Sequence, residues 1–168
     1  IKARFGDDRR TELVPMENEI VLEDLIERHT CVITMSHAGY IKRQASSVYS
    51  AQHRGGKGVI GMGTKEEDYI ERMLAVNSHS YLLMFTSRGR VYVKKAYAIP
   101  EAGRTAKGTN IVNILDLMPD ERVTAMVAVD GFDSDKYLTM VTSRGVIKRT
   151  PLSEFEIYRR GGKIALSL

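Results

Sequence analysis

The sequence predicts an all-β protein made of about three blade-sized units, each with roughly four strands. The first indication is a stretch that occurs three times, as "CVITMSHAGYIKR", "YLLMFTSRGRVYVKK" and "YLTMVTSRGVIKR". Each copy is an apolar run, a four-residue turn that starts with Ser or Thr and ends in Gly, and a second run that ends in a basic pair. The second indication is the spacing, because the closing glycines Gly39, Gly89 and Gly145 lie 50 and 56 residues apart.

Each recurring stretch predicts a β-hairpin. The β-branched and aromatic residues on both sides of the turn favour strands, and the closing glycine supplies the positive φ that the turn requires. The stretches between the hairpins, "DYIERMLAVNSHS" and "ERVTAMVAVDGFDSD", predict further strands because their apolar residues are closely spaced and end in polar turn residues. The stretch "KEEDY" is interpreted as a solvated turn.

The beginning of the chain differs from the repeats. Residues 1–18 are interpreted as the end of a helical connector and a linker, because helix-forming residues lead into Pro15. Residues 19–168 are predicted to form the partial β domain, with blades at approximately 19–64, 65–115 and 116–168. Three such blades would give a partly closed array with an unpaired edge.

The repeat continues beyond each turn in a fixed sequence frame. An apolar residue follows the closing glycine by ten positions, an arginine by fifteen and a lysine by eighteen. These positions are Tyr49, Ile99 and Phe155, then Arg54, Arg104 and Arg160, then Lys57, Lys107 and Lys163. The stretch "QHRGGKG" of the first unit is therefore interpreted as having degenerate copies, "GRTAKG" and "RRGGK", in the next two units.

Basic and acidic segments alternate along the chain. Residues 37–58 hold 4 Lys or Arg and 0 Asp or Glu, whereas residues 59–80 hold 2 against 4. Residues 81–109 hold 6 against 1, and residues 110–136 hold 2 against 6. A surface shaped only for solubility would mix the two signs, so this segregation favours a protein that presents a basic side to a polyanion.

Several functional classes are excluded by the sequence. No apolar run approaches the roughly 20 residues that span a bilayer. The single cysteine, Cys31, fits a reducing compartment, and the histidines show no metal-ligand spacing with it. A nucleotide-binding P-loop would need Gly where Ala51 stands, and Ser or Thr where Gly58 stands. No catalytic residue is identified, and the tyrosines are interpreted as packing residues.

The remaining interpretation of "QHRGGKG" is a loop that binds phosphates of a nucleic-acid backbone. Successive glycines let backbone N–H groups point into one concavity, and Arg54 and Lys57 add positive charge. The alternative is a flexible surface turn without a ligand. The in-frame copies and the alternating charge favour the phosphate-binding interpretation.

At these residues the sequence resembles the carboxy-terminal domain of the DNA gyrase A subunit. The family's box is Gln-(Arg/Lys)-Arg-Gly-Gly-(Arg/Lys)-Gly, and here His53 replaces the usual basic residue at the second position. The stretch "FGDDRRTEL" also resembles the end of the helical segment that joins the family's breakage-reunion core to this domain. The box residues that the resemblance implies for DNA binding are Gln52, His53, Arg54, Gly55, Gly56, Lys57 and Gly58.

The resemblance implies a β-pinwheel, a propeller-like array whose blades exchange strands and whose outer rim is basic. The family's wheel has more blades than this chain can hold, so the chain is expected to be a fragment. In the family, the rim wraps duplex DNA in a positive sense, and the holoenzyme of A and B subunits converts this wrapping into negative supercoils with ATP. ATP, Mg²⁺ and the DNA-cleaving tyrosine are implied to lie outside this chain, in a bacterial cytoplasmic enzyme.

Beyond the box, the basic residues of the units are predicted to contact phosphates without reading bases. They are Lys42, Arg43, Arg88, Arg90, Lys94, Lys95, Arg104, Lys107, Arg144, Lys148, Arg149, Arg159, Arg160 and Lys163. Two alternatives stay open. One is the equivalent domain of the topoisomerase IV A subunit, which shares the blades but lacks or degrades the box. The other is a protein-interaction propeller, which would have an uncharged or mixed rim.

Overall fold

The computed structural model describes residues 4, 6, 11, 22–49, 62–63, 68–157 and 159–167. The predicted phosphate-binding loop, residues 52–58, lies outside the described residues, as does most of the predicted helical tail. The elements of the described part are β-strands and short 3-10 helices, which confirms the predicted all-β class. None of the helices described is long and apolar enough to cross a membrane.

The first sheet has four antiparallel strands in the order β3-β1-β2-β6. They are β1 (Thr30–Ser36), β2 (Tyr40–Ala45), β3 (Ile70–Asn77) and β6 (Thr109–Asn110). In the register of the sheet, Ile33 of β1 lies opposite Arg43 of β2 and Leu74 of β3. Six of the seven residues of β1 are buried, as expected for an inner strand covered on both faces.

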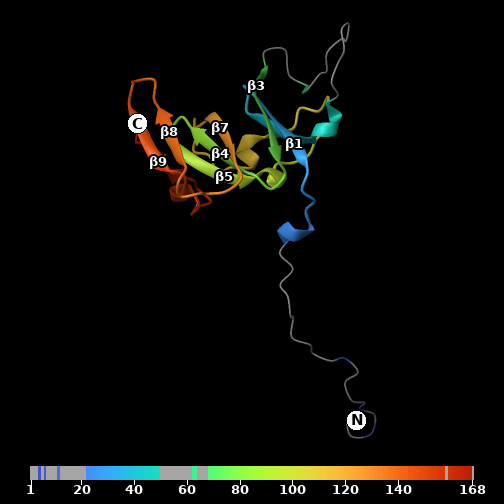
Figure 1. Ribbon diagram of the computed structural model, residues 1–168. Coiled ribbons are helices and arrows are strands. Elements are labelled where there is room, and N and C mark those ends of the chain that lie inside the picture. Colours follow the sequence, from blue (N-terminus) through green and yellow to red (C-terminus); the bar gives the residue numbers. More distant parts are fainter. Residues whose placement is uncertain are drawn as a thin grey trace.

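The second sheet repeats this arrangement in the order β10-β5-β4-β7. Its strands are β4 (Tyr81–Thr86), β5 (Arg90–Lys95), β7 (Val123–Val129) and β10 (Lys163–Ile164). The third sheet is the hairpin of β8 (Tyr137–Val141) and β9 (Ile147–Pro151). Figure 1 shows the second sheet between the first sheet and the β8–β9 hairpin.

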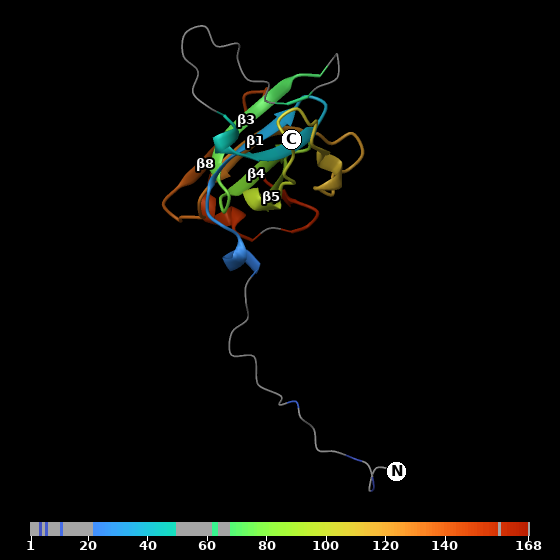
Figure 2. The ribbon, with the colours of Figure 1, turned by 90° about the vertical axis from the view of Figure 1, so that its right-hand side faces the viewer.

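The sheets are interlocked by strand exchange. β3 leads directly into β4, yet it pairs with β1 of the preceding sheet, and β7 leads into β8 but pairs with β4. β6 and β10 likewise return to β2 and β5 of the sheet before them. The first and second sheets therefore each take two strands from the sequence of the following unit, as the resemblance to a pinwheel implied. In Figure 2, seen from the β1–β3 side, the second sheet lies behind the first.

The three predicted hairpin turns are present with nearly the same geometry. The closing glycines Gly39, Gly89 and Gly145 have φ values of 82°, 69° and 79°, as predicted from the turn chemistry. In each turn the glycine N–H donates to the carbonyl of the Ser or Thr that opens the turn, at 3.0 Å. The hydroxyl of that Ser or Thr accepts from the backbone N–H that follows the glycine.

A short 3-10 helix follows the second strand of each hairpin. These helices are η2 (Ser46–Val48), η3 (Ala96–Ala98) and η5 (Leu152–Phe155); η1 (Leu22–Leu25) and η4 (Ile111–Asn113) lie elsewhere. The apolar anchors predicted ten residues after each glycine lie at these helices: Ile99 and Phe155 are buried, and Tyr49 is half-buried.

Among the residues that the structure describes, the core has two apolar layers, one on each face of the second sheet. Leu82 and Met84 of β4 face the layer shared with the first sheet, whereas Leu83 of the same strand packs with Phe155 on the side of the β8–β9 hairpin. This assignment follows from the period of two along a strand. The second sheet is therefore a blade held between two neighbours.

Candidate nucleic-acid interface

The predicted rim residues in the described part differ widely in exposure. Arg88, Arg104, Arg144, Lys148, Arg149, Arg159 and Arg160 are exposed, and Arg43, Arg90, Lys94, Lys95, Lys107 and Lys163 are partly exposed. The hairpin turns give one pair of equivalent cations. Arg88 and Arg144 each stand directly before the closing glycine of their turn, where the backbone holds them outward at the end of a hairpin. Ala38 occupies this position in the first turn.

The prediction that Lys42 belongs to the DNA-binding rim was wrong. Its side chain is 0 % exposed, and its ammonium group donates to the carbonyls of Gly103 at 2.9 Å, Arg104 at 2.8 Å and Ala106 at 3.0 Å. Burial lowers the pKa of Lys42 from its ordinary value. A buried ammonium with three carbonyl partners has no access to a phosphate on the surface. Lys42 is therefore a structural residue that holds the second unit's loop against the first sheet.

The equivalent positions in the other units carry the same kind of contact. Tyr92, three residues after Gly89 as Lys42 is after Gly39, is buried and donates its hydroxyl to the carbonyl of Asp116 at 2.9 Å. Lys148, three residues after Gly145, is exposed and donates to the carbonyl of Ala165 at 2.7 Å. This position of the hairpin thus secures loop backbone in all three units.

The loops that follow the hairpins are not aligned as the sequence frame predicted. Thr109 pairs with Ile41 and Lys163 pairs with Val91, so these two residues occupy equivalent places in β6 and β10. The glycines before them, Gly108 and Gly162, have φ values of 82° and 75°.

A Cβ on either of these glycines would clash with the hairpin of the preceding unit. On Gly108 it would lie 2.5 Å from the carbonyl oxygen of Ile41, and on Gly162 it would lie 2.9 Å from the ring of Tyr92. These two glycines are therefore the structural equivalents. Lys107 precedes its glycine whereas Lys163 follows its own, so the prediction that the two lysines are equivalent was wrong by two residues.

Several rim cations are engaged with neighbouring groups. Ion pairs join Arg43 to Glu101 at 3.2 Å, Lys95 to Glu23 at 2.7 Å, Arg160 to Asp116 at 2.8 Å and Lys163 to Glu154 at 3.6 Å. Lys107 lies over the ring of Tyr40, and Arg149 lies over the ring of Tyr137, at 3.7 and 3.9 Å from the ring centroids. Within the described part of the chain, no carboxylate forms an ion pair with Arg88, Arg144 or Arg149.

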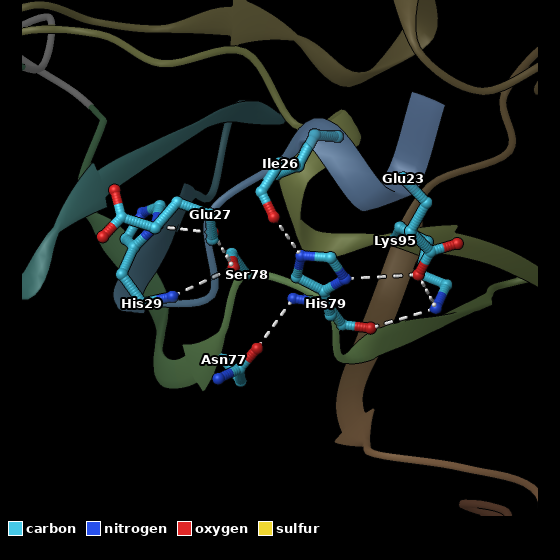
Figure 3. A network of polar contacts seen from close by, with 8 residues as sticks. All are labelled: Glu23, Ile26, Glu27, His29, Asn77, Ser78, His79 and Lys95. Atoms are coloured by element: carbon cyan, nitrogen blue, oxygen red, sulfur yellow. Dashed lines mark hydrogen bonds and ion pairs between the residues drawn. The ribbon is translucent and has the colours of Figure 1, made fainter. Parts of the chain in front are cut away.

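A polar network attaches the segment around η1 to the turn between β3 and β4 (Figure 3). The ring of His79 is mostly buried, with Nε2 2.8 Å from the carbonyl of Ile26 and Nδ1 3.3 Å from the carboxylate of Glu23. The hydrogen bond from Lys95 lowers the pKa of the Glu23 carboxyl. Ser78 extends the network by donating its hydroxyl to the carbonyl of Glu27 at 2.9 Å. This network fixes the direction in which the chain enters the first sheet.

Sequence reasoning missed the role of acidic residues beside the turns. Asp68, in the stretch interpreted as a solvated turn, accepts from the backbone N–H of Ala38 at 2.9 Å. Glu121 is 6 % exposed and accepts from the hydroxyl of Thr86 at 2.5 Å. The one available signal was positional, because both acids stand two residues before a strand. No group of three or more His, Cys, Asp or Glu that could hold a metal ion occurs among the described residues.

Three hairpin units, of which the first two are completed by strands of the following unit, define a propeller-type domain, with exposed arginines at the second and third turns. The sequence matches the family described as "DNA gyrase C-terminal domain, beta-propeller" over residues 32–77, 80–130 and 136–168. The three matched ranges correspond to the three hairpin units. The chain belongs to this family.

Curated relatives give the same assignment. The chain is 46 % identical to the DNA gyrase A subunit of Clostridium acetobutylicum over 168 residues, and 48 % identical to that of Escherichia coli (strain K12) over 165 residues. These matches cover 100 % and 98 % of the chain. They cover only 20 % and 19 % of the relatives, so the chain spans about a fifth of their length.

Solved structures show the same fold in two related enzymes. A DNA gyrase A C-terminal domain superposes with a TM-score of 0.67 and 29 % identity, over 81 % of this chain and 43 % of that one. The C-terminal domain of DNA topoisomerase IV superposes with a TM-score of 0.66 and 25 % identity, over 81 % of this chain and 41 % of that one. The fold alone therefore does not separate the two enzymes.

Proposed function

We propose that this chain binds duplex DNA largely independently of sequence and wraps it in a positive sense, as part of a DNA gyrase A subunit. The observation that carries this proposal is the match of all three hairpin units to the gyrase C-terminal domain. The box sequence of residues 52–58 and the exposed Arg88 and Arg144 support it, because they supply cations at recurring places. Contacts of this kind neutralise phosphates and position the duplex without reading bases.

Wrapping requires the bound duplex to bend, and bending costs free energy. Smooth bending of a 20–30 base-pair segment by 40–90° costs on the order of 1–6 kcal/mol. Several phosphate contacts must offset this cost, so a single arginine is insufficient. Arg88, Arg144, Arg149 and Arg159 are exposed, and the box adds Arg54 and Lys57.

The salt dependence of binding tests this proposal. If about six phosphates are neutralised, the logarithm of the binding constant for linear duplex should fall with the logarithm of salt concentration at a slope near −5. The affinity should depend little on base sequence. A flat salt response, or a strong preference for one sequence, would contradict the model of a phosphate-binding rim.

The alternative within the same fold is the topoisomerase IV A subunit. The sequence "QHRGGKG" favours gyrase, because the topoisomerase IV domain lacks or degrades this box. The full-length protein, combined with its B subunit, ATP and Mg²⁺, should introduce negative supercoils into relaxed plasmid. Relaxation and decatenation without supercoiling would assign the chain to topoisomerase IV instead.

The chain's place in the holoenzyme follows from the same assignment. In the proposed A2B2 assembly in the bacterial cytoplasm, ATP and Mg²⁺ bind to other domains, and DNA cleavage takes place in the preceding core.

A protein-interaction propeller is the alternative from another class. It is disfavoured by the alternation of basic and acidic segments, and the titration with duplex DNA described above tests it directly.

A further inference from the structure

Two of the hairpin turns are held by the segment that directly precedes the later strand, β3 or β7, that pairs with the hairpin's first strand. In the first unit the N–H of His37 donates to the carbonyl of Tyr69, and in the second the N–H of Ser87 donates to the carbonyl of Arg122, both at 2.9 Å. Tyr69 and Arg122 are the residues directly before β3 and β7. The contact is therefore a repeated feature of the fold, and it joins each turn to the following unit.

An acidic residue stands one position earlier in both segments and completes the contact. In the second unit Glu121 accepts from the hydroxyl of Thr86 through Oε1 and from the backbone N–H of Met118 at 2.8 Å through Oε2. The hydroxyl of Tyr92, whose proton is shared with the carbonyl of Asp116, also lies 3.3 Å from Oε2. In the first unit Asp68 accepts through Oδ1 from the N–H groups of Ala38 and Tyr69. A buried carboxylate that accepts several hydrogen bonds holds the backbone around it in one conformation.

The segment of Glu121 also holds the side chain of the arginine that the second turn displays. Arg88 donates through Nη2 to the carbonyl of Pro119 at 2.9 Å. The hydroxyl of Thr86, which Glu121 accepts from, also accepts from the N–H of Arg90 at 3.3 Å. Residues 118–122 therefore hold the opening of the turn, at Thr86 and Ser87, and the direction of its cation.

We propose that Glu121 is a positioning residue for DNA binding, which holds the turn so that Arg88 reaches a phosphate. This inference rests on the proposed DNA-binding function. The proposed role of Glu121 predicts a change in DNA affinity opposite in sign to the change expected from net charge alone. Removing a negative charge from a DNA-binding protein ordinarily strengthens binding, because the protein's net charge rises. Loss of Glu121 is expected to weaken it.

A double-mutant cycle in the full-length protein tests the proposal. Arg88→Ala should lower the affinity for linear duplex several-fold and reduce the salt slope by about 1. Glu121→Gln should produce the same loss, and the double variant should lose no more than either single variant. Additive losses, or tighter binding by Glu121→Gln, would overturn the proposal.

Two controls make the cycle specific. Glu156→Gln removes an exposed carboxylate and should bind DNA at least as tightly as the parent protein. Arg144→Ala removes the equivalent arginine of the third turn, which Glu121 does not contact, so its loss should add to that of Glu121→Gln. Non-additivity with Arg144 as well would indicate a general disturbance and would overturn a local positioning role.

A milder pair of variants covers the case in which Glu121→Gln fails to fold. Thr86→Val removes the hydroxyl that Glu121 accepts from, and Thr86→Ser keeps it. The valine variant should lose affinity as Arg88→Ala does, and the serine variant should retain it. If Arg88→Ala itself binds normally while the parent protein keeps its steep salt slope, the positioning proposal fails but DNA binding stands. If the parent protein shows no salt-dependent binding, the proposed function fails.

Discussion

Lys42 illustrates how one residue type can serve two purposes in this domain. Lysine is rarely fully buried unless its charge is paired. Here three backbone carbonyls, 61 to 64 residues further along the chain, surround the ammonium group. This buried cation therefore adds to the contact that Arg43 makes between β2 and the second unit through the carbonyl of Pro100 and the carboxylate of Glu101. Its burial was not predictable from the basic pair in the sequence, because the partner carbonyls carry no sequence signal.

Replacing this cation should destabilise the fold. Lys42→Met keeps most of the side-chain volume but leaves three carbonyls without their donor, and it should lower the free energy of unfolding by about 2–4 kcal/mol. Urea denaturation of the full-length protein measures this loss. Lys94→Met, a partly exposed lysine of β5, is the matched control and should change stability by less than about 0.5 kcal/mol. Equal losses from the two variants would contradict the structural role of Lys42.

The carboxylate of Glu121 should make stability depend on pH. Burial alone would raise its pKa, but the hydrogen bonds, led by that from Thr86, outweigh this effect and hold the pKa below its ordinary value. Because the folded-state pKa is lowered, the stabilisation is present above the unfolded value of about 4.3 and is lost as the pH falls through the folded value. The difference in urea midpoint between the parent protein and Glu121→Gln should therefore be large at neutral pH and shrink below about pH 4. A difference independent of pH would contradict this explanation.

At the scale of elements, the hairpins were predictable from the residues, whereas the particular strands that pair with each hairpin were not. The turns formed as predicted because Ser or Thr at the start and Gly at the end act within four residues. The pairing of β3 with β1 depends on packing between units, and the sequence around residues 70–77 predicts a strand without naming its neighbour. The shift between Lys107 and Lys163 has a similar cause, because Gly108 and Gly162, rather than the lysines, set the alignment of the loops.

Gly108 provides a test of this strand exchange. An alanine there would have an unfavourable positive φ, and its Cβ would collide with the carbonyl of Ile41, so β6 could not reach β2. We expect Gly108→Ala to lower the free energy of unfolding by about 2–4 kcal/mol. Gly103→Ala is the control in the same loop, since its Cβ would meet nothing within 4 Å. Thermal unfolding of the two variants should differ clearly, and equal melting temperatures would show that the approach of β6 is not restrictive.

At the scale of the whole molecule, some cations form contacts that hold the fold together and others are exposed on the surface. Lys42, Lys95 and Arg43 contact carbonyls or carboxylates that connect segments far apart in the sequence, whereas Arg144 is exposed at its turn and Arg88 stays exposed although it donates to the carbonyl of Pro119. A formal net charge of +4 therefore understates how unevenly the cations are placed. The acidic segments between hairpins supply Asp68 and Glu121, so the alternation of charge reflects structural contacts as well as the predicted binding surface.

The box sequence should separate wrapping from the other activities of the proposed holoenzyme. Arg54→Ala combined with Lys57→Ala removes two of its cations, and both residues belong to the loop predicted to bind phosphates. Under the proposed function, wrapping would determine the sign of the DNA crossing that is passed, whereas relaxation and decatenation would need only strand passage. We therefore expect the variant to lose most of its negative supercoiling in a plasmid assay while it retains relaxation and decatenation. Equal loss of all three activities would indicate misfolding, and full retention of supercoiling would contradict a role for the box in wrapping.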